Sequence, residues 1–445
     1  MLWDIIIVGA GAAGLFVGCE VLRAAQSNGL CSKAGASRSH PTLRVLLLEK
    51  YNYVGGRLYT YHKRLANRDV QWEVGAGRLS LNHHRVLRLL RKYDLHLAAP
   101  GTAPELWLTE GEAPAPSPYA SLFPLVLQQF GKLSPAVLAT HTLADLMHKI
   151  GQEHLLSLFP YWSELHTLRA DLALTTFLHG EFSSKERFCT VAEGYGALAK
   201  AMAAEFERLG GVLQTGATVL DVRSVRTKRG KNLCQLKVLQ EGLRTDILAK
   251  TCVLATHLNA LRSMPSVRRR MPVLRHLQME PLVRMYAVFP VTDGKAWFSG
   301  LPRMVTAGRV RYIIPINEQK GIIMISYTDG ADARYWVDAQ KRHGDDWVAK
   351  EVLQEVRALL PDRSIPEPYA FKIHPWFSGC TYWRPGRYDV QKALTEGLDL
   401  GDGLFACGES LSLRQAWVEG ALESAEALVS LPAFASQFKK NRENE

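Results

Sequence analysis

The chain has 445 residues, of which 47% are apolar and 22% are charged. This composition excludes a disordered, collagenous or coiled-coil chain, and at about 100–200 residues per domain the length predicts two to four domains' worth of chain. The formal net charge of +11 suits acidic ligands or nucleic acid but does not bear on the fold. Seven cysteines without a CxxC pair indicate reduced thiols in a cytoplasmic protein.

The predicted elements begin with a strand, a glycine turn and a helix, and they end in the same way. A β-branched run at 4–8 predicts a buried strand, and apolar residues at helical spacing follow over 12–25. The other predicted strands are 43–49, 212–222, 233–239, 246–255, 282–289, 309–316, 321–328 and 404–407. The other predicted helices are 81–95, 194–209, 345–359 and 414–430. Loops are predicted at 26–42 and at the proline-rich segment 100–118, and a polar tail at 433–445.

Residues 2–18 are apolar enough to imitate a signal peptide, but they lack a basic start and are interrupted by Gly9, Gly11 and Gly14. No apolar stretch approaches the roughly 20 residues that a membrane span needs. We therefore expect no membrane span and no targeting segment.

Those glycines form a motif between the first strand and the first helix. Gly9, Gly11 and Gly14 give the pattern G-x-G-x-x-G. The first glycine makes a tight turn, the second lets a pyrophosphate approach the backbone, and the third lets the helix pack on the strand. Glu49 ends the next strand, where a carboxylate accepts hydrogen bonds from ribose hydroxyls. Together these features predict a dinucleotide site.

Two further segments favour FAD over NAD. Residues 55–57, Gly-Gly-Arg, give a second close approach of the backbone and an arginine that can neutralise a pyrophosphate. Residues 408–410, Gly-Glu-Ser, follow the last strand and predict a second helix N-terminus near the redox-active ring. An NAD enzyme needs neither segment, whereas an enzyme that encloses a whole FAD needs both.

At these segments the chain resembles the flavin-containing amine oxidoreductase family, which includes monoamine oxidases, polyamine oxidases and L-amino acid oxidases. The resemblance is weakest over 96–190, where such families differ most. The matching segments follow one another in the family's order and spacing, at 9–14, 49, 55–57, 73–76, 193–198, 219, 253–255, 404–409 and 417–421.

The resemblance implies an α/β flavoprotein with two domains. A Rossmann-like, discontinuous FAD-binding domain is expected at 1–80, 190–272 and 395–432. An inserted α+β substrate domain of mixed sheet and helices is expected at 81–189 and 273–394. The residues expected to contact FAD are Gly9, Gly11, Ala13, Gly14, Glu49, Lys50, Gly56, Arg57, Gly75, Ala76, Gly77, Arg78, Val219, Gly408, Glu409, Trp417 and Val418.

The chemistry that the resemblance implies is oxidation of a C–N bond. A hydride leaves the carbon that bears the amine for flavin N5, the imine is hydrolysed, and O2 reoxidises the flavin to give hydrogen peroxide. The protein holds the amine neutral and its C–H over N5. An acid–base pair is therefore not required, and none is evident in the sequence.

Arg78 separates the substrate classes of the family. Residues 75–79, Gly-Ala-Gly-Arg-Leu, resemble the segment of L-amino acid oxidases whose arginine binds the substrate carboxylate in bidentate fashion. Monoamine and polyamine oxidases typically lack arginine there. This chain departs from the pattern at Gly77, where the usual residue is Met. The alternative for Arg78 is a pyrophosphate contact or a surface arginine.

The other candidate catalytic residues surround the expected flavin ring. Trp417 stands where the family places one wall of an aromatic cage, and Tyr382 and Trp383 are candidates for the opposite wall. The family commonly has a Lys at the position of Arg284, and a water molecule bridges that Lys to flavin N5. With Arg284 in its place, the enzyme could be a slow oxidase or could use another electron acceptor. Cys380 lies where monoamine oxidases attach flavin covalently, and a buried small hydrophobe is the alternative.

Two remaining patterns do not predict a site. His83 and His84 lack a metal-ligand spacing and predict a solvated helix end, so no metal is expected. Residues 268–270, Arg-Arg-Arg, predict a solvated loop, because no nucleic-acid module accompanies them.

The sequence thus predicts an FAD-dependent oxidase of L-amino acids, with O2 as acceptor and no nucleic-acid partner. A monoamine or polyamine oxidase is the first alternative, although the net charge disfavours a polycationic substrate. A flavin desaturase and a non-catalytic FAD-binding protein are further alternatives. The sequence leaves the oligomeric state of the protein open.

Overall fold

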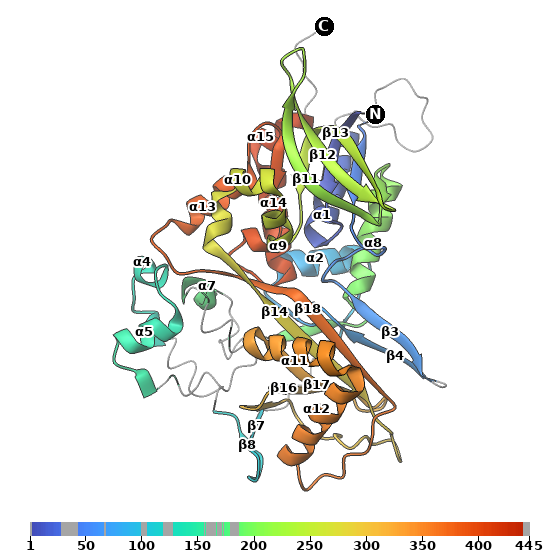
Figure 1. Ribbon diagram of the computed structural model, residues 1–445, viewed down its shortest axis with the longest axis vertical. Helices are drawn as coiled ribbons and strands as arrows, with labels where there is room; N and C mark the ends of the chain where they lie inside the picture. The colour runs from blue at the N-terminus through green and yellow to red at the C-terminus, as the bar shows by residue number, and fades with distance from the viewer. Residues whose placement is uncertain are drawn as a thin grey trace.

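The computed structural model describes residues 2–27, 43–65, 68–98, 105–118, 128–154, 156, 166, 171, 173–178 and 187–438. The described residues form two lobes along the long axis of the molecule (Figure 1). Strands β14 (Leu277–Val288) and β18 (Ala370–Trp383) are paired and run from the upper lobe into the lower lobe.

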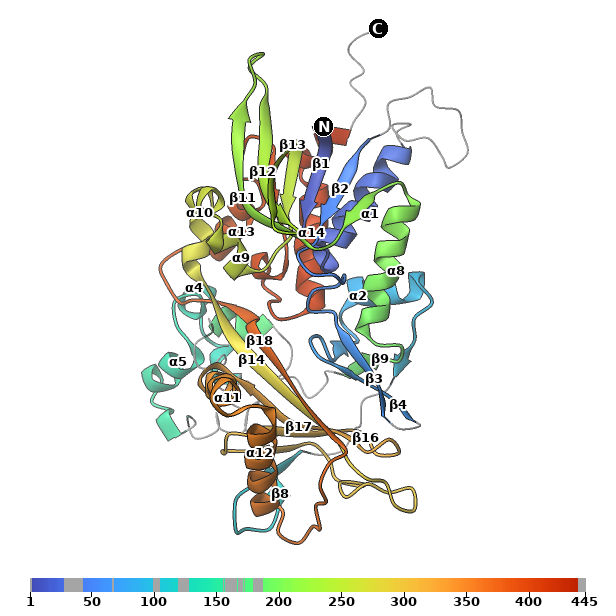
Figure 2. The ribbon, with the colours of Figure 1, turned by 45° about the vertical axis from the view of Figure 1, so that its right-hand side comes forward.

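The upper lobe contains an open sheet assembled from three separate parts of the chain. Its parallel strands lie in the order β10–β2–β1–β13–β19, which is the 3-2-1-4-5 order of dinucleotide-binding sheets. Strands β12 and β11 extend the sheet in antiparallel fashion from the other half of β13 (Figure 2). The bounds are β1 (Leu2–Val8), β2 (Val45–Leu48), β10 (Val212–Gln214), β11 (Ala217–Arg226), β12 (Asn232–Gln240), β13 (Leu243–Leu254) and β19 (Leu404–Ala406).

Helices cover both faces of this sheet, which explains the unbroken apolar runs in its strands. Successive side chains of β1 enter opposite cores: Ile5 and Ile7 pack in one, and Ile6 and Val8 in the other. The first core lies against α1 (Ala12–Ser27), α2 (His84–Lys92), α8 (Tyr195–Arg208) and α14 (Val418–Ser430). The second lies against α9 (Leu258–Ser263), α10 (Pro265–Arg270), the 3-10 helix η2 (Pro272–His276) and α13 (Val390–Leu398).

The lower lobe contains a mixed sheet in the order β18–β14–β17–β16–β15–β7–β8, in which only the β15–β7 pair is parallel. Helices α11 (Gly330–His343) and α12 (Asp345–Leu359) cover one face. The sheet's remaining strands are β7 (Leu106–Leu108), β8 (Ala115–Pro116), β15 (Met304–Thr306), β16 (Tyr312–Asn317) and β17 (Ile322–Asp329).

The hairpin of β3 (Thr60–Leu65) and β4 (Arg68–Glu73) packs with the lower sheet. Trp72 and Val74 share a buried cluster with Leu282 and Tyr286 of β14. The sequence assigns this hairpin to the FAD-binding domain, but in the structure it packs against the sheet of the lower lobe. The domain limits themselves stay a prediction.

The smaller elements complete the described chain. A three-stranded sheet has the order β5 (Leu79–Ser80), β9 (Phe188–Val191), β6 (Leu97–Ala98), and short helices are α4 (Pro135–Leu138), α5 (Leu143–Lys149), α7 (Ala173–Leu178) and the 3-10 helix η3 (Glu409–Leu411). The predicted loop 26–42 lies largely outside the described residues. None of the described helices is long and apolar enough to cross a bilayer.

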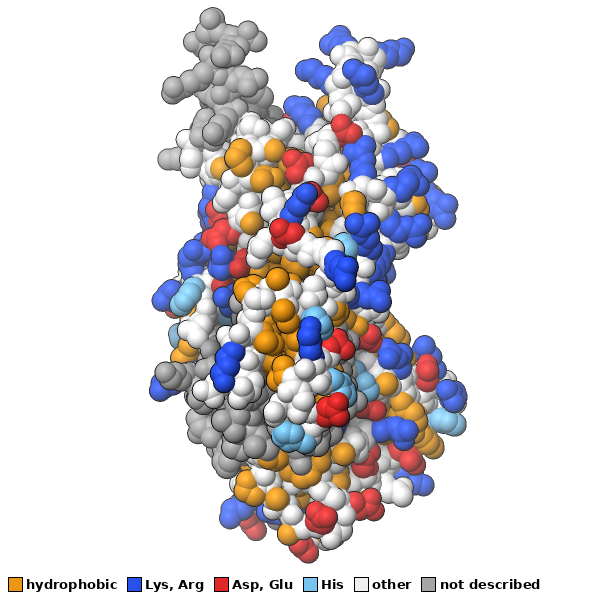
Figure 3. All heavy atoms as spheres, turned by 90° about the vertical axis from the view of Figure 1, so that its left-hand side faces the viewer, with side chains coloured by type: hydrophobic (Ala, Val, Ile, Leu, Met, Phe, Trp, Pro, Cys, Tyr) orange, Lys and Arg blue, Asp and Glu red, His pale blue; other side chains and the backbone are white. Residues whose placement is uncertain are grey.

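Two predictions at the surface need correction. The predicted polar tail begins too early, because α15 (Pro432–Ala435) buries Phe434 against Phe405, with ring centroids 5.1 Å apart. The predicted solvated loop at 268–270 is the last turn of helix α10, where Arg270 pairs with Asp402 at 2.8 Å. Lys and Arg side chains gather along one edge of the upper lobe in the view of Figure 3.

Candidate active site

A cavity of about 870 Å³ lies between the two lobes. In the upper lobe its wall follows the carboxyl ends of β1, β2 and β13, which is where open α/β sheets bind ligands. In the lower lobe β14, β17 and β18 supply the wall. The predicted cofactor contacts that line it are Gly9, Gly11, Ala13, Glu49, Lys50, Gly56, Arg57, Gly75, Ala76, Gly77, Arg78, Val219, Gly408, Glu409, Trp417 and Val418.

Gly14 is a predicted contact that lies outside the cavity wall formed by the described chain. A Cβ on Gly14 would collide with the carbonyl oxygen of Gly9. Gly9 itself has φ +105°, and a Cβ there would lie 2.5 Å from the Ala255 oxygen. Gly14 therefore lets helix α1 pack on the turn and does not line the site, whereas Gly9 shapes the turn that does.

The carboxylate of Glu49 is fixed at the end of β2. Its Oε2 accepts the N–H of Ala10 at 2.8 Å, and its Oε1 accepts the N–H of Tyr51 at 2.9 Å. Burial raises the pKa of Glu49, which these backbone bonds oppose. Each oxygen has a second lone pair, so the group can also accept from ribose hydroxyls.

The cavity fits the FAD expected from the sequence. A Cβ on Gly56 would meet only the Cα of Gly11, at 3.9 Å, so the two glycine turns leave an open cradle between them. Oγ1 of Thr256 is buried at this wall and lacks a hydrogen-bond partner among the residues that the structure describes. Lys50 adds positive charge at the cavity wall, which favours a pyrophosphate.

Arg57 forms a partly buried ion pair that the sequence did not reveal. Its Nη2 donates to Oε2 of Glu409 at 2.7 Å and its Nη1 to the Gly379 carbonyl at 2.9 Å. Burial alone would raise the pKa of Glu409, but Arg57 and the hydrogen bonds hold that pKa below its usual range. Glu409 also accepts the N–H groups of Thr381 (3.3 Å) and Ala416 (3.1 Å). Glu409 thus joins the glycine turn, β18 and the residue before Trp417.

Arg78 lies against aromatic rings. Its guanidinium carbon is 4.5 Å from the ring centroid of Phe188 and 5.7 Å from that of Trp417. The two rings are stacked at 5.9 Å, and His83 meets Trp417 edge-on at 4.8 Å. The structure therefore brings together Arg78 and Trp417, the two residues that the sequence placed on the substrate side.

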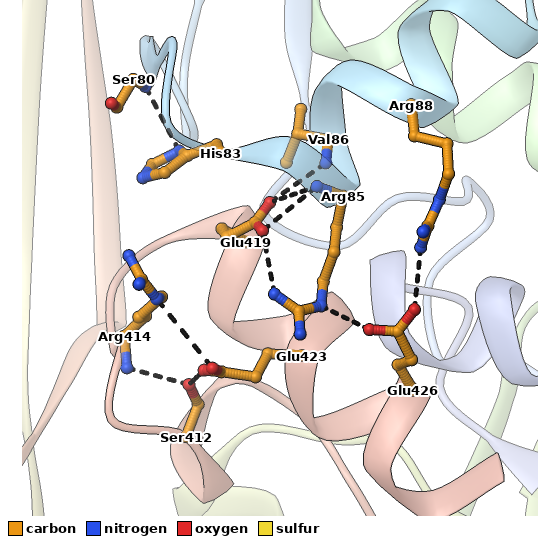
Figure 4. A network of polar contacts seen from close by, with 10 residues as sticks. All are labelled: Ser80, His83, Arg85, Val86, Arg88, Ser412, Arg414, Glu419, Glu423 and Glu426. Carbon is orange, nitrogen blue, oxygen red and sulfur yellow. Dashed lines mark hydrogen bonds and ion pairs between the residues drawn. The ribbon is translucent and has the colours of Figure 1, made fainter. Parts of the chain in front are cut away.

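His83 is buried, with 3% of its surface exposed, so the predicted solvated helix end is wrong for this residue. Its Nδ1 accepts the N–H of Ser80 at 3.3 Å (Figure 4). The ring is buried because it packs on Trp417, a neighbour distant in sequence that no local pattern reveals.

A network of polar contacts links helix α14 to helix α2 (Figure 4). Glu419, in the first turn of α14, accepts the N–H groups of Arg85 and Val86 and pairs with the Arg85 guanidinium at 3.1 Å. It therefore caps α2, because the side chain of the α2 N-cap residue, His83, makes no capping hydrogen bond. Arg85 also pairs with Glu426 at 2.7 Å. The N-terminus of α14, where Trp417 is the N-cap residue, is thereby attached to α2.

Arg284 projects from β14 to the cavity wall. Its Nη1 donates to the carbonyls of Gly75 and, at 3.4 Å, Glu73, and its guanidinium lies 4.8 Å from the ring centroid of Tyr327. The positive charge that the sequence predicted is therefore present at the cavity. It is held by backbone carbonyls of the segment that leads to Arg78.

The structure places Tyr382 and Trp383 away from the cavity outlined by the described residues. Trp383 is fully buried in the upper core and donates to the Ser412 carbonyl at 3.0 Å. Tyr382 donates to Glu280 at 3.4 Å. Neither therefore forms a wall opposite Trp417. Cys380, on the same strand, does line the cavity. A covalent link between Cys380 and the flavin stays a hypothesis.

Sequence reasoning missed two histidines of the cavity wall. Burial lowers the pKa of both His257 and His374 to about 4. Nε2 of His374 accepts the indole N–H of Trp72 at 2.9 Å, so the neutral ring carries its hydrogen on Nδ1. His374 pairs with Arg284 across β18 and β14. Both rings are uncharged at pH 7 and can serve as hydrogen-bond partners.

Glu73 is a buried acid beside this cluster, and we expect it to give stability a distinct pH dependence. Oε1 accepts from Thr60 Oγ1 at 2.9 Å and from the N–H of Tyr195 at 3.0 Å, and burial raises the pKa of Glu73 to about 7. Because this pKa is raised, the stabilising contribution of Glu73 is fully present below about pH 4.5 and is lost as the pH rises through 7. The loss is on the order of 3 kcal/mol.

The variant Glu73→Gln should remove this slope. The measurement is the urea midpoint of the FAD-bound protein at pH 5, 6, 7 and 8, compared with Glu207→Gln, an exposed glutamate on the neighbouring helix α8. Stability of the wild type should decline from pH 5 to 8 more steeply than that of Glu73→Gln. Parallel curves for the two proteins would contradict the assignment.

Comparisons with known proteins agree with this architecture. The family model described as flavin containing amine oxidoreductase matches residues 34–428. A solved triple mutant of putrescine oxidase, from a structure-based redesign of cofactor binding, is similar over 96% of this chain and 97% of its own, with a TM-score of 0.68 and 16% sequence identity. No curated protein sequence matches the chain. The structural likeness extends to both lobes and therefore supports the fold.

Proposed function

The chain belongs to the flavin-containing amine oxidoreductase family, and on this premise we propose that it oxidises L-amino acids. FAD is the cofactor, and when bound it accepts the hydride from the carbon that bears the amine. Water then hydrolyses the imine to a keto acid and ammonia, and O2 takes up the electrons and becomes hydrogen peroxide. The protein's own residues bind and orient the substrate.

The position of Arg78 carries the proposal. Its guanidinium lines the cavity and rests on Phe188 and Trp417. A planar guanidinium binds a carboxylate through two parallel hydrogen bonds and stays charged at any working pH. The aromatic rings restrict its rotation, so less entropy is lost when a carboxylate binds. Such a group suits an amine that bears a carboxylate on the neighbouring carbon.

Trp417 supplies the second contact with the substrate. The ring belongs to the cavity wall and packs against His83 and Phe188, and the Glu419 network attaches the start of its helix to α2. An aromatic face excludes water and favours a nitrogen that becomes cationic during oxidation. Arg78 for the carboxylate and Trp417 for the amine side would together set the orientation of the Cα–H bond.

An amine oxidase without a carboxylate requirement is the second candidate. Asp171 favours it, because this buried carboxylate also lines the cavity and accepts a hydrogen bond from Thr175 at 2.8 Å. A carboxylate in the wall stabilises a cationic group on the substrate. The two candidates differ in whether the substrate's carboxylate is needed.

The deciding experiment is anaerobic reduction of the bound flavin, followed by its visible absorbance. L-Amino acids are compared with amines that have the same side chains but no carboxylate. We expect bleaching of the oxidised flavin band by the amino acids and slow or no bleaching by the matched amines. Bleaching by the amines alone would replace the proposal with the amine oxidase, and a flavin unchanged by both would favour a desaturase or a non-catalytic protein.

A further inference from the structure

Gly77 and Arg284 are in contact, although 206 intervening residues separate them in the chain. A Cβ placed on Gly77 would lie 3.1 Å from Nη1, 3.7 Å from Nη2 and 3.8 Å from Cζ of Arg284. These three guanidinium atoms are the nearest atoms to that position. A side chain at position 77 would therefore begin in tight contact with the guanidinium.

The backbone gives no other reason for a glycine at 77. Its φ lies outside the left-handed region, so an L-residue could adopt the same conformation without strain. Gly75, two residues earlier, differs in this respect, because a Cβ there would collide with the backbone carbonyl of Arg57. Gly75 is required by its backbone neighbour, whereas a side chain at 77 would require the Arg284 guanidinium to give way slightly.

Arg284 in turn holds the segment that contains Gly77. Its Nη1 donates to the carbonyls of Glu73 and Gly75, and Tyr327 supports the other side of the guanidinium. Tyr286, next on the same face of β14, donates to the Glu73 carbonyl as well, at 2.5 Å. Two side chains of one strand thus anchor the backbone that leads directly into Arg78.

We propose that Gly77 and Arg284 form one structural unit, in which the missing side chain at 77 makes room for a guanidinium that fixes the backbone of residues 73–78. Arg284 is then a positioning residue for Arg78. The link to substrate binding rests on the proposed function, whereas the coupling of the two residues does not.

The rival explanation is that Gly77 is small because a ligand approaches it, since Gly77 also lines the cavity. The two explanations predict different results for a double-mutant cycle of Gly77→Met, Arg284→Lys and the combined variant. A side chain at 77 must displace the guanidinium if the residues are a unit. A lysine keeps the charge but has no planar fork to displace, so it should tolerate the longer side chain.

We expect Gly77→Met to raise the KM for L-amino acids about tenfold in the parent protein, with a smaller change in kcat, and less than about threefold in the Arg284→Lys background. The thermal midpoint and the absorbance maximum of the bound flavin should show the same non-additivity. Gly77→Ala serves as a milder variant if Gly77→Met does not fold, because its Cβ alone comes within 3.1 Å. Arg309→Lys is the matched control, as Arg309 stacks on Tyr335 at 4.1 Å outside the cavity.

Equal effects of Gly77→Met in both backgrounds, on KM and on the thermal midpoint, would overturn the unit and favour the ligand explanation. If no amino acid reduces the flavin but the midpoint remains non-additive, the proposed function fails and the unit stands. If amino acids are oxidised and every effect is additive, the proposed function stands and the unit fails.

Discussion

Replacement of Arg78 by methionine is expected to lower kcat/KM for L-amino acids about 100- to 10,000-fold, mainly through KM. The variant loses two charge-assisted hydrogen bonds to the substrate carboxylate, each of which contributes about 1.5–3 kcal/mol. Methionine keeps an apolar side chain against Phe188 and Trp417, so the aromatic pair should persist. The measurement is the rate of anaerobic flavin reduction as a function of amino acid concentration.

Three comparisons separate a role in substrate binding from a general one. Arg78→Lys keeps the charge but not the bidentate geometry and should fall between the wild type and Arg78→Met. An amine without a carboxylate should reduce Arg78→Met as fast as it reduces the wild type. Arg187→Met, at an exposed arginine beside Phe188, should behave as the wild type does. An equal loss for amino acids and amines would assign Arg78 to the cofactor or to stability.

The sheet of the upper lobe was predictable from sequence because its strands are buried on both faces. Ile5–Val8 and Val45–Leu48 are unbroken apolar runs, and the left-handed φ of Gly9 and the contact of Gly14 with the Gly9 carbonyl are constraints of the local turn. Strand β18 was not predicted. Its exposure does not alternate regularly, and its last four residues, Cys380–Trp383, are all buried. A run buried on both faces does not indicate which side chains meet the cavity, so Tyr382 and Trp383 were assigned to the wrong place.

The parts of the site that escaped prediction depend on partners distant in sequence. Helices α2 and α8 have no capping side chain at their own N-cap residues. Glu419 caps α2 from 334 residues away, and Glu73 accepts the first N–H of α8 from 122 residues away. The contact between Gly77 and Arg284 is of the same kind. In each case the local sequence does not explain the residue present, and a charged group that the fold brings close does.

The pair of Arg57 and Glu409 gives the largest expected effect on stability. Arg57→Met should lower the free energy of unfolding by about 3–5 kcal/mol, because it leaves a carboxylate that is only 5% exposed without its cation. The loss should spread to the cofactor site, since Glu409 also binds the N–H of Ala416, whose φ of 63° is unusual for a residue other than glycine. The readouts are the urea midpoint and the FAD retained after gel filtration.

The sign of the pH dependence tests this cause. In the wild type the pKa of Glu409 is held below 4.5, so its contribution is present above 4.5 and is lost as the pH falls through the folded value. Without Arg57, burial raises the pKa of Glu409. Protonation of Glu409 then increases the stability of the variant as the pH falls. The deficit of Arg57→Met should therefore shrink between pH 8 and pH 5, and Glu409→Gln added to Arg57→Met should recover part of it.

A surface pair provides the matched control for this prediction. Arg270 and Asp402 are 2.8 Å apart, but both side chains are more than a third exposed, so Arg270→Met should cost no more than about 1 kcal/mol. Similar losses for Arg270→Met and Arg57→Met would show that burial of Glu409 does not determine the effect. A deficit of Arg57→Met that stays constant from pH 8 to pH 5 would assign the loss to packing of the arginine side chain, because packing does not depend on the ionisation of Glu409.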